Sequence, residues 1–367
     1  MSLPSVLVNM LWCVPGRVGG SEEYLVRQLL GVAEQPAPRW QPVVAVARGL
    51  AAAHPELAAA VEVVEPRFDS SSRARRVLGE ATWLRRHSRE AELVHHGGGT
   101  APRGAHRPYV LTIHDLQFRT YPQYFSRAKR AYLGALIPPS ARRATVVAVP
   151  SEYVRESVVQ AYGVLPERVM VVPHGIEPAV VSQVTSPGEL RLRYALGEGP
   201  IIVYPAVTHP HKHHRFLLQM MRDHWRDPDL RLVLTGGPGM ADAEVAACDD
   251  PRVLRLGRVS AADRNGLLAM AEALVFPSQY EGFGAPLIEA MTLGAPVVCS
   301  DATCMPQIVG DAGLVRPTTA DAWAGVLDEV AARRSELVTA GHRRANDFTS
   351  RASGAALSAV YAQALGL

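Results

Sequence analysis

Short continuous apolar runs alternate with stretches whose apolar residues recur at helical spacing, and this alternation occurs twice along the chain. Continuous apolar strands between helices are typical of parallel sheets that are covered on both faces. The pattern therefore predicts an α/β protein with two doubly wound sheets. In the first half we expect strands at Val6–Trp12, Val43–Val46, Leu93–His96, Val110–Ile113, Val146–Val149 and Val169–Val172, with helices at Glu22–Val32, Ser126–Leu136 and Ser151–Ala161. In the second half we expect strands at Ile201–Tyr204, Leu232–Leu234, Val253–Leu256, Ala273–Phe276 and Pro296–Cys299.

A polar stretch with proline and glycine, from Glu177 to Gly199, separates the two sets and is interpreted as a linker. We therefore expect one domain at residues 1–178 and a second at residues 199–350. A last helical segment, residues 352–367, follows the second sheet and is free to pack back onto the first domain.

Composition agrees with a globular protein, since 48% of the 367 residues are hydrophobic and 20% are charged. No apolar run approaches the roughly 18 residues that span a bilayer, and the N-terminus does not resemble a signal peptide. The four cysteines lack metal-ligand spacing and lie mostly in apolar segments, so we interpret them as reduced core residues of a cytoplasmic protein. They are Cys13, Cys248, Cys299 and Cys304.

The charge is uneven. Residues 1–180 carry 21 Lys and Arg against 15 Asp and Glu (+6), whereas residues 181–367 carry 17 against 20 (−3). Only the first half is therefore expected to meet an anionic partner, and nucleic acid is not predicted. Much of the excess lies on one predicted helix, where six arginines alternate with apolar residues. Such a helix can rest on an anionic membrane, but we favour a core-packed helix with a solvated basic face. The arginines are Arg73, Arg75, Arg76, Arg85, Arg86 and Arg89, and the apolar residues are Val77, Leu78, Ala81 and Leu84.

The segment Tyr280–Ala295 carries the most specific chemistry. A predicted strand precedes it, Pro286 suits the first turn of a following helix, and two carboxylates, Glu281 and Glu289, lie eight positions apart. A strand-to-helix turn presents backbone N–H groups that suit a phosphate. The two carboxylates can accept hydrogen bonds from sugar hydroxyls on either side of a diphosphate. A nucleotide sugar has this shape.

Other polar residues follow predicted strands, where ligands of open parallel sheets gather. Gly19 and Gly20 would let a ligand approach the backbone closely, although a plain turn is the alternative. His114 and Asp115 end another strand. His114 is a candidate for contact with a substrate hydroxyl or a reacting centre, although an isolated histidine in such a place is more often structural.

The segment His209–His214 contains four histidines around Lys212, whose ammonium group can neutralise part of a diphosphate. The histidines suggest a metal site, but a core-packing pattern (Phe216, Leu217, Met220) begins there, so we favour a structural role. The D-x-D at Asp227–Asp229 precedes a strand, whereas a metal-diphosphate site would follow one, so no essential metal is expected. Gly236 and Gly237, like Arg258 and Val259, border either a nucleotide or an ordinary loop.

In order and spacing these motifs resemble the retaining, nucleotide-sugar-dependent glycosyltransferases of family 4. The resemblance covers nearly the whole chain and implies the GT-B fold, with two Rossmann-like domains facing a central cleft. The paired-glutamate motif is its specific element, and the block from Tyr204, Y-P-A-V-T-H-P-H-K-H-H, is similar to the bacterial mannosyltransferase branch. Supporting motifs are G-G-S-E at Gly19–Glu22, I-H-D at Ile113–Asp115, V-P-S-E at Val149–Glu152 and V-V-P-H-G-I at Val171–Ile176.

The resemblance also implies roles. The first domain would bind the acceptor and the second the nucleotide sugar. Glu281 would hold hydroxyls of the donor hexose, Glu289 the ribose and Lys212 the diphosphate, with His114 beside the anomeric carbon. Many members carry an arginine about five residues before the lysine, where Val207 or its neighbours stand here. Leaving-group stabilisation would then rest on Lys212, backbone donors and Arg258 or a nearby histidine. Further donor contacts would come from Gly19, Gly20, Val259, Phe283, Gly284, Ala285 and Leu287.

The leading hypothesis is a retaining α-mannosyltransferase that uses GDP-mannose without an essential cofactor or metal. Two alternatives stay open. The first is a transferase for glucose or N-acetylglucosamine with a UDP-sugar donor. The second is a catalytically silent GT-B protein that binds nucleotide sugars. The acceptor is a glycan or a glycolipid. A glycolipid acceptor would place the protein peripherally at the inner face of the membrane.

Overall fold

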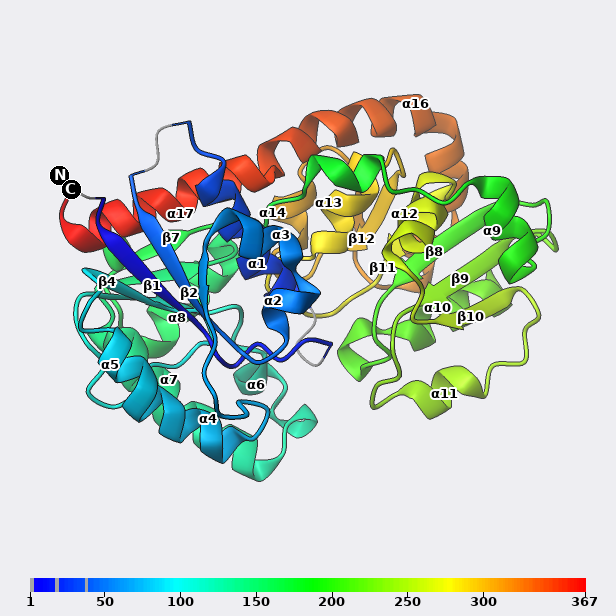
Figure 1. Ribbon diagram of the computed structural model, residues 1–367. Helices are drawn as coiled ribbons and strands as arrows, with labels where there is room; N and C mark the ends of the chain where they lie inside the picture. Colours follow the sequence, from blue (N-terminus) through cyan, green and yellow to red (C-terminus); the bar gives the residue numbers. More distant parts are fainter. Residues whose placement is uncertain (1–2, 17–19, 37–38) are drawn as a thin grey trace. The chain divides into compact units, whose positions relative to one another are not determined.

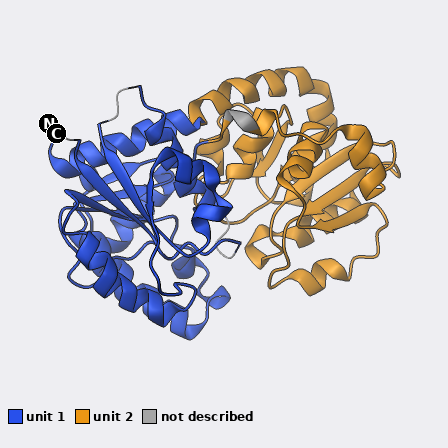
Figure 2. Cartoon of the chain, in the orientation of Figure 1, with its two compact units in different colours: residues 1–175, 349–367 blue, residues 176–348 orange. Residues whose placement is uncertain are grey.

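The computed structural model describes residues 3–16, 20–36 and 39–367, and its elements are labelled in Figure 1. The chain forms two compact units, which Figure 2 shows in different colours. Unit 1 comprises Met1–Gly175 together with Thr349–Leu367, and unit 2 comprises Ile176–Phe348.

Among the described residues of unit 1, seven parallel strands form one sheet in the order β3-β2-β1-β4-β5-β6-β7. The chain moves outward in one direction from β1 and in the other from β4, so these two strands flank a topological switch point. Residues on both faces of β1 are buried, as its continuous apolar run predicts. The strands are β1 (Ser5–Met10), β2 (Gln41–Val46), β3 (Glu62–Val64), β4 (Leu93–His96), β5 (Tyr109–Thr112), β6 (Val146–Val149) and β7 (Val169–Val171).

Helices cover this sheet. The helix α1 packs closely against the last helix, α17, because two glycines let the backbones touch. A Cβ on Gly31 would lie 1.9 Å from the carbonyl oxygen of Ser350, and one on Gly354 would lie 2.1 Å from the carbonyl carbon of Gly31. The helical elements of unit 1 are α1 (Gly20–Ala33), α2 (Leu50–Ala53), α3 (Pro55–Ala60), α4 (Arg73–Gly79), the π-helical turn η1 (Glu80–Leu84), α5 (Arg85–His87), α6 (Gln117–Thr120), η2 (Pro122–Tyr124), α7 (Arg127–Arg143), α8 (Glu152–Tyr162), η3 (Pro166–Arg168) and α17 (Ser350–Leu365).

The arginine-rich segment differs from our expectation. It is not one continuous helix, because the π-helical turn η1 separates α4 from α5. Leu84 is buried at 2% exposure, but Val77 and Leu78 are 42% and 65% exposed. Ala81 is exposed as well, so the prediction of a core-packed apolar face is wrong for three of its four residues, and only Leu84 reaches the core.

Among the described residues of unit 2, six parallel strands form a second sheet in the order β10-β9-β8-β11-β12-β13. The prediction of two parallel α/β sheets is thus confirmed. The strands are β8 (Ile201–Pro205), β9 (Arg231–Thr235), β10 (Val253–Gly257), β11 (Ala273–Phe276), β12 (Val297–Ser300) and β13 (Leu314–Arg316). The helical elements are η4 (Pro178–Val181), α9 (Pro187–Tyr194), η5 (Pro210–Lys212), α10 (His214–Asp223), α11 (Asp242–Ala246), α12 (Ala261–Ala269), α13 (Ala285–Thr292), α14 (Met305–Val309), α15 (Ala320–Ala324), α16 (Val326–Ala345) and η6 (Asn346–Phe348).

The segment that we interpreted as a linker is structured. It contains α9, and Asp263 of α12 accepts hydrogen bonds from Thr185 Oγ1 (2.6 Å), Tyr194 Oη (2.6 Å) and Arg193 Nη1 (2.7 Å). Leu190 of α9 is fully buried. This segment therefore belongs to unit 2, where it packs on α12.

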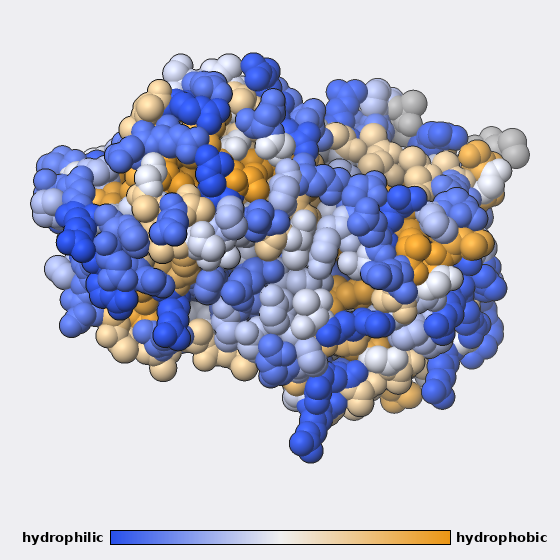
Figure 3. Space-filling view, turned by 180° about the vertical axis from the view of Figure 1, so that it is seen from behind, coloured by the Kyte–Doolittle hydropathy of each residue, from blue (hydrophilic) through white to orange (hydrophobic). Residues whose placement is uncertain are grey.

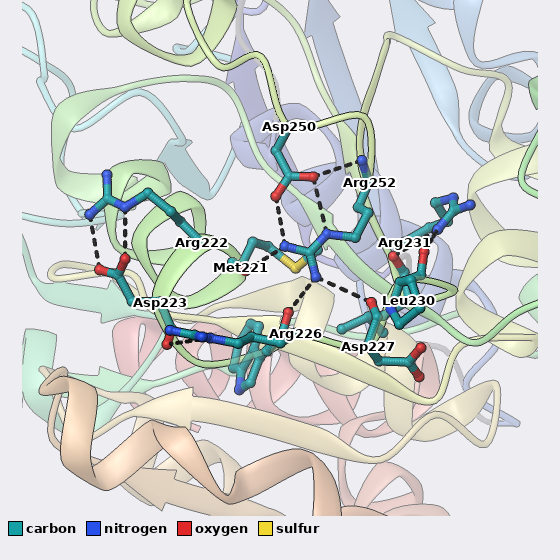
Figure 4. Close-up of polar contacts among 11 residues, drawn as sticks. Met221, Arg222, Asp223, Arg226, Asp227, Leu230, Arg231, Asp250 and Arg252 are labelled. Carbon is teal, nitrogen blue, oxygen red and sulfur yellow. Dashed lines mark hydrogen bonds and ion pairs between the residues drawn. The ribbon is translucent and has the colours of Figure 1, made fainter.

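The D-x-D sequence lies in the turn that connects α10 to β9 (Figure 4). Arg252 organises this turn: it pairs with Asp250 and donates hydrogen bonds to the backbone carbonyls of Met221 (2.5 Å) and Asp227 (3.2 Å). Asp227 Oδ1 accepts from the backbone N–H of Asp229 at 2.9 Å. The two aspartates therefore belong to a structural turn at the amino end of β9, opposite the edge where ligands of parallel sheets bind.

Among the described helices, none is both long and apolar enough to cross a membrane. The face seen in Figure 3 is largely hydrophilic, with apolar residues in separate patches.

Candidate active site

The candidate site of unit 2 is built at the switch point of its sheet. After β8 the chain continues to β9 and β10 on one side, and after β11 it continues to β12 and β13 on the other. The loops that leave β8 and β11 therefore diverge and open a crevice at the carboxyl edge of the sheet. Lys212 follows β8 and Glu281 follows β11, so the fold brings both residues to this crevice.

Lys212 and Glu281 form an ion pair there, with 2.5 Å between Nζ and Oε1. Their side chains are only 19% and 12% exposed, so water screens the pair weakly. Two hydrogen bonds to its backbone carbonyls hold the loop that carries Lys212. Tyr204 Oη donates to the Lys212 carbonyl at 2.6 Å, and the backbone N–H of Gln279 donates to the His211 carbonyl at 2.7 Å. The cation therefore occupies a defined position.

The backbone around Glu281 is held by the loop after β12. The N–H of Glu281 donates to Thr303 Oγ1 at 3.1 Å, and the Cys304 thiol donates to the Glu281 carbonyl at 3.3 Å. Thr303 has a φ of 55°, which is costly for a β-branched residue and marks a position held by its surroundings. Sequence analysis did not identify Thr303, and no local signal in the sequence points to it.

The helix α13 begins at this crevice with Gly284 as its N-cap. The φ of Gly284 is 83°, and no side chain caps the helix. A Cβ on this glycine would lie 2.9 Å from Leu287 Cδ1, so both the backbone and the packing favour glycine. An uncapped helix N-terminus with its positive dipole end is a suitable place for a phosphate.

Glu289 is one turn further along α13 and is only 4% exposed. Its Oε1 lies 3.7 Å from Arg264 Nη2 of α12, so the carboxylate has a cationic neighbour. Phe283 and Leu287 are buried at 3% and 0% exposure, whereas Ala285 is half-buried. Phe283 packs edge-on against Phe348 at 5.5 Å between ring centroids. The side chains of Phe283 and Leu287 therefore belong to the packing of unit 2, and the donor contacts that the resemblance implies for this turn stay a prediction.

Arg258 and Val259 follow β10. The Arg258 side chain is exposed and lies over Gly237, where a Cβ would be 2.9 Å from its Nε. Gly236 has a φ of 129°, and a Cβ there would lie 2.4 Å from the carbonyl oxygen of Ala206. These glycines let the loops after β8, β9 and β10 meet at the carboxyl edge.

Two of the four histidines around Lys212 are part of the core. His211 and His214 are 8% and 2% exposed, and burial lowers their pKa values to about 3 and about 4, so both are neutral at physiological pH. His214 packs against the Tyr204 ring, 4.8 Å away. Within the described residues, no group of three His, Cys, Asp or Glu side chains is placed to hold a metal ion. The expectation of metal-independent chemistry stays a prediction.

His114 lies in unit 1, beside the carboxyl ends of β4 and β5. Its Nε2 is 2.8 Å from the carbonyl oxygen of Gly97 and must carry the proton, which leaves Nδ1 as an acceptor. Burial lowers the pKa of His114 to about 4, so the ring is neutral at physiological pH. Trp12 and Tyr24 flank it, with ring centroids 5.7 and 5.4 Å away.

The glycines that follow β4 were missed by sequence analysis. A Cβ on Gly97 would lie 2.4 Å from Leu25 Cδ1, and one on Gly98 would lie 2.6 Å from Trp12 Cδ1. The loop can therefore pass close to these side chains only because it lacks its own. Three consecutive glycines after an apolar strand were the available signal.

Of the predicted glycine pair, Gly19 lies outside the described residues, and Gly20 begins α1. A Cβ on Gly20 would meet no atom of the described residues within 4 Å, so their packing does not require glycine at this position. In the first turn of α1, Glu22 Oε1 is 2.9 Å from His54 Nε2. The predicted site residues thus form two groups, one in each unit.

Two family models match consecutive parts of the chain. A model described as Glycosyltransferase Family 4 matches residues 18–180, and one described as Glycosyl transferases group 1 matches residues 199–333. Together they span most of the chain.

Curated relatives are consistent with these matches. O-antigen chain mannosyltransferase B of Escherichia coli is 31% identical over 227 residues, which are 58% of this chain and 58% of that protein. MMP alpha-(1->4)-mannosyltransferase of Mycolicibacterium hassiacum is 32% identical over 216 residues, which are 56% of this chain and 50% of that protein. The chain thus spans between half and three fifths of the length of these relatives.

Solved structures share the fold. HepE of Anabaena, solved with UDP and glucose, is similar at a TM-score of 0.74 and 18% identity over 98% of this chain and 99% of that one. WaaG, a glycosyltransferase involved in lipopolysaccharide biosynthesis, is similar at a TM-score of 0.70 and 17% identity over 96% and 98%. Likeness at this identity shows the fold alone, which is GT-B. The two family models, which together match most of the chain, show that it belongs to the family 4 glycosyltransferases.

Proposed function

We propose that this protein is a retaining hexosyltransferase that moves an α-mannosyl group from GDP-mannose to a hydroxyl of a glycan or glycolipid. The observation that carries the proposal is the Lys212–Glu281 pair, 2.5 Å apart at the switch point of unit 2 and close in sequence to the uncapped N-terminus of α13. An ammonium group and helix N–H groups suit a diphosphate, and a carboxylate suits the hydroxyls of a hexose.

The main electrostatic demand of the reaction is charge on the departing nucleoside diphosphate. In our proposal Lys212 and the positive dipole end of α13 stabilise this charge, because both are positioned before the reaction and need no reorganisation. Glu281 has two tasks: one oxygen orients Lys212, and the carboxylate also accepts hydrogen bonds from donor hydroxyls. Glu289 holds the ribose. No step in this scheme assigns a role to a metal.

In the transfer step, the acceptor oxygen forms a bond to the anomeric carbon on the face from which the phosphate oxygen departs. The acceptor proton passes to an oxygen of the departing diphosphate. His114 is neutral and does not supply a proton at physiological pH. In this scheme its Nδ1 accepts a hydrogen bond from a donor hydroxyl and so orients the hexose.

The sugar is chosen on the relatives, two of which are named as mannosyltransferases, whereas GDP as the base is our hypothesis from the family resemblance. The alternative is a UDP-sugar donor, and the similar protein HepE was solved with UDP and glucose. A thermal-shift panel of GDP-mannose, UDP-glucose, UDP-N-acetylglucosamine and ADP-glucose separates these cases. A ligand at about 100 times its Kd should stabilise the fold by about 2.7 kcal/mol. Stabilisation by a UDP-sugar but not by GDP-mannose would reject the mannose assignment.

A catalytically silent protein would bind the donor without breaking it. Incubation with the stabilising nucleotide sugar and a panel of methyl glycosides, followed by NMR of the anomeric proton, tests turnover and stereochemistry together. We expect an α-linked product from an α-linked donor. A β-linked product would reject retention, and binding without any released nucleotide would favour the silent alternative.

The exposed residues Val77 and Leu78 favour a glycolipid acceptor at the cytoplasmic face of a membrane, because exposed arginines, Arg73 and Arg75, lie beside them on α4. Cosedimentation with vesicles containing acidic lipid at low salt tests this part of the proposal. We expect binding that Leu78→Ser weakens and that Leu192→Ser, a change at an exposed leucine of unit 2, leaves unchanged. No sedimentation at low salt would remove the membrane contact.

A further inference from the structure

A narrow cavity in unit 1 is separate from the candidate site residues described above. It opens between the π-helical turn η1 and the loop at residues 102–106, beside the end of β4. Glu80, the first residue of η1, and His96, the last residue of β4, supply its polar lining. Its apolar walls include Leu84, Val94, Pro102 and Ala105. A π-helical turn is an uncommon element that often occurs at functional sites.

Asn9 of β1 determines which nitrogen of His96 carries a proton. The backbone N–H of Leu11 donates to Asn9 Oδ1 at 3.1 Å, so the amide oxygen faces this donor. Asn9 Nδ2 then faces His96 Nδ1 at 3.4 Å and Glu80 Oε1 at 3.5 Å. Because an amide nitrogen can only donate, His96 Nδ1 is the acceptor and the ring proton of neutral His96 is on Nε2.

The Nε2–H group of His96 is a buried donor. His96 is 2% exposed, and its Nε2 has no hydrogen-bond partner among the described residues. Burial lowers the pKa of His96 to about 4, so the ring stays neutral at physiological pH. Buried polar groups in native proteins nearly always have partners. An oxygen that accepts from His96 is therefore expected in the cavity that His96 lines.

Glu80 provides the complementary group. Its side chain is 12% exposed, and burial raises its pKa despite Arg76, whose Nε is 3.9 Å away, and Asn9. The two polar residues that line the cavity thus carry one donor without a partner among the described residues, His96 Nε2–H, and one acceptor, the Glu80 carboxylate. A hydroxyl group accepts and donates through a single oxygen and matches both. A phosphate or carboxylate would instead be repelled by Glu80.

The size of the cavity also favours a single hydroxyl group. The cavity is small, about 10 Å³, which is room for about one oxygen atom. The apolar walls suit the C–H groups next to a hydroxyl on a sugar ring. Water fills such a site when nothing else does, and a sugar hydroxyl can replace that water with the same two hydrogen bonds.

We propose that this cavity, the hydroxyl pocket, receives one hydroxyl group of the acceptor sugar, with Glu80 and His96 orienting it. This inference rests on the proposed function, because it takes the bound sugar to be the acceptor of the transfer. Glu80 and His96 are then positioning residues that select acceptors with a hydroxyl at one ring position.

The test uses the whole protein labelled with ¹⁵N-histidine and the methyl α-glycosides of mannose, glucose, galactose and N-acetylglucosamine as probes. We expect at least one glycoside to shift the His96 ring resonances. Among the monodeoxy analogues of that glycoside, one should bind about tenfold more weakly or worse, since it lacks the hydroxyl that both groups hold. Glu80→Gln should weaken binding of the parent glycoside to a similar degree, without further weakening binding of that analogue.

Two controls accompany the test. Thr82→Ala, an exposed position of the same π-helical turn that does not line the cavity, should bind like the wild type. Nucleotide-sugar binding by each variant shows whether unit 2 is intact, and His96→Phe provides a second variant if Glu80→Gln fails to fold.

The outcomes separate the two proposals. If nucleotide sugars bind but no glycoside moves the His96 resonances, the hydroxyl pocket is refuted and the transferase proposal stands. The same holds if all monodeoxy analogues bind equally well. If a glycoside binds at His96 while every nucleotide sugar fails to bind, the pocket stands as a sugar site and the transferase proposal falls.

Discussion

The ion pair between Lys212 and Glu281 allows a structural and a catalytic role to be separated. Lys212→Met keeps most of the aliphatic stem but removes the charge, and it leaves Glu281 at 12% side-chain exposure without its partner. Removing one member of a buried pair leaves an uncompensated charge, and we expect a loss of about 3 kcal/mol in the free energy of unfolding. For a unit of this size that corresponds to a fall in Tm of about 6–12 °C.

The double variant Lys212→Met, Glu281→Gln removes both charges together. Replacing both members of a buried pair with neutral residues is often nearly neutral, so we expect its stability to lie within about 1 kcal/mol of the wild type. Turnover should behave differently. If Lys212 stabilises the departing diphosphate, both the single and the double variant lose about 10²–10³ in kcat.

Calorimetry or urea denaturation measures stability, and release of nucleoside diphosphate measures turnover. The reasoning predicts that stability returns in the double variant while kcat does not. Recovery of kcat together with stability would show that Lys212 acts only as a structural partner of Glu281. Wild-type kcat in Lys212→Met would refute the catalytic role directly.

Three further predictions concern single residues. Glu289→Ala should weaken nucleotide binding by about 1.5–3 kcal/mol in titration calorimetry, because charged hydrogen bonds are lost. Glu272→Ala, at the opposite edge of the sheet, is the control. An unchanged nucleotide Kd in Glu289→Ala would contradict a ribose contact. His114→Gln should lower kcat about tenfold for one lost hydrogen bond, with kcat/KM profiles parallel to the wild type between pH 5 and 8, because burial keeps the pKa of His114 at about 4. A wild-type inflection in that range that the variant lacks would show that His114 titrates there. Burial alone would lower the pKa of His54, but hydrogen bonds to Glu22 and Glu56 outweigh it and raise the pKa. The stability that charged His54 contributes is therefore present below its unfolded pKa and is lost as pH rises through its folded pKa. His54→Gln should flatten the fall of the urea midpoint between pH 6 and 8, and an equally steep fall in the variant would argue against a charged His54–Glu22 pair.

Strand positions followed from the sequence wherever a strand is buried on both faces. The predicted strands at Leu93–His96, Val146–Val149 and Ala273–Phe276 have the bounds seen in the structure. The strands β3 and β13 were missed: each has three residues at a sheet edge, as β7 has, but β7 lies in a continuous apolar run (Val169–Val172), whereas β3 begins with Glu62 and β13 ends with Arg316. A short edge strand needs few apolar residues, so it leaves no clear pattern.

The arginine-rich segment shows a limit of periodicity. Its apolar residues recur at helical spacing, which predicts an amphipathic helix but not what covers the apolar side. In the structure Leu84 reaches the core while Val77 and Leu78 face solvent. The helical pitch changes at η1, which Gly79 directly precedes, but a single glycine inside a helical pattern does not predict a π-helical turn.

The paired-glutamate segment and its strand-to-helix turn were evident from the sequence, because strand, glycine, proline and helix signals are local. The chain by itself thus determined two parallel α/β sheets and the nature of the groups at their carboxyl ends. Only the tertiary structure decided which of these groups meet. Lys212 touches Glu281 across 69 residues, and Asn9 reaches His96 across 87. Such pairs depend on strand order and loop packing, which bring distant residues together without leaving a repeating pattern in the residues themselves.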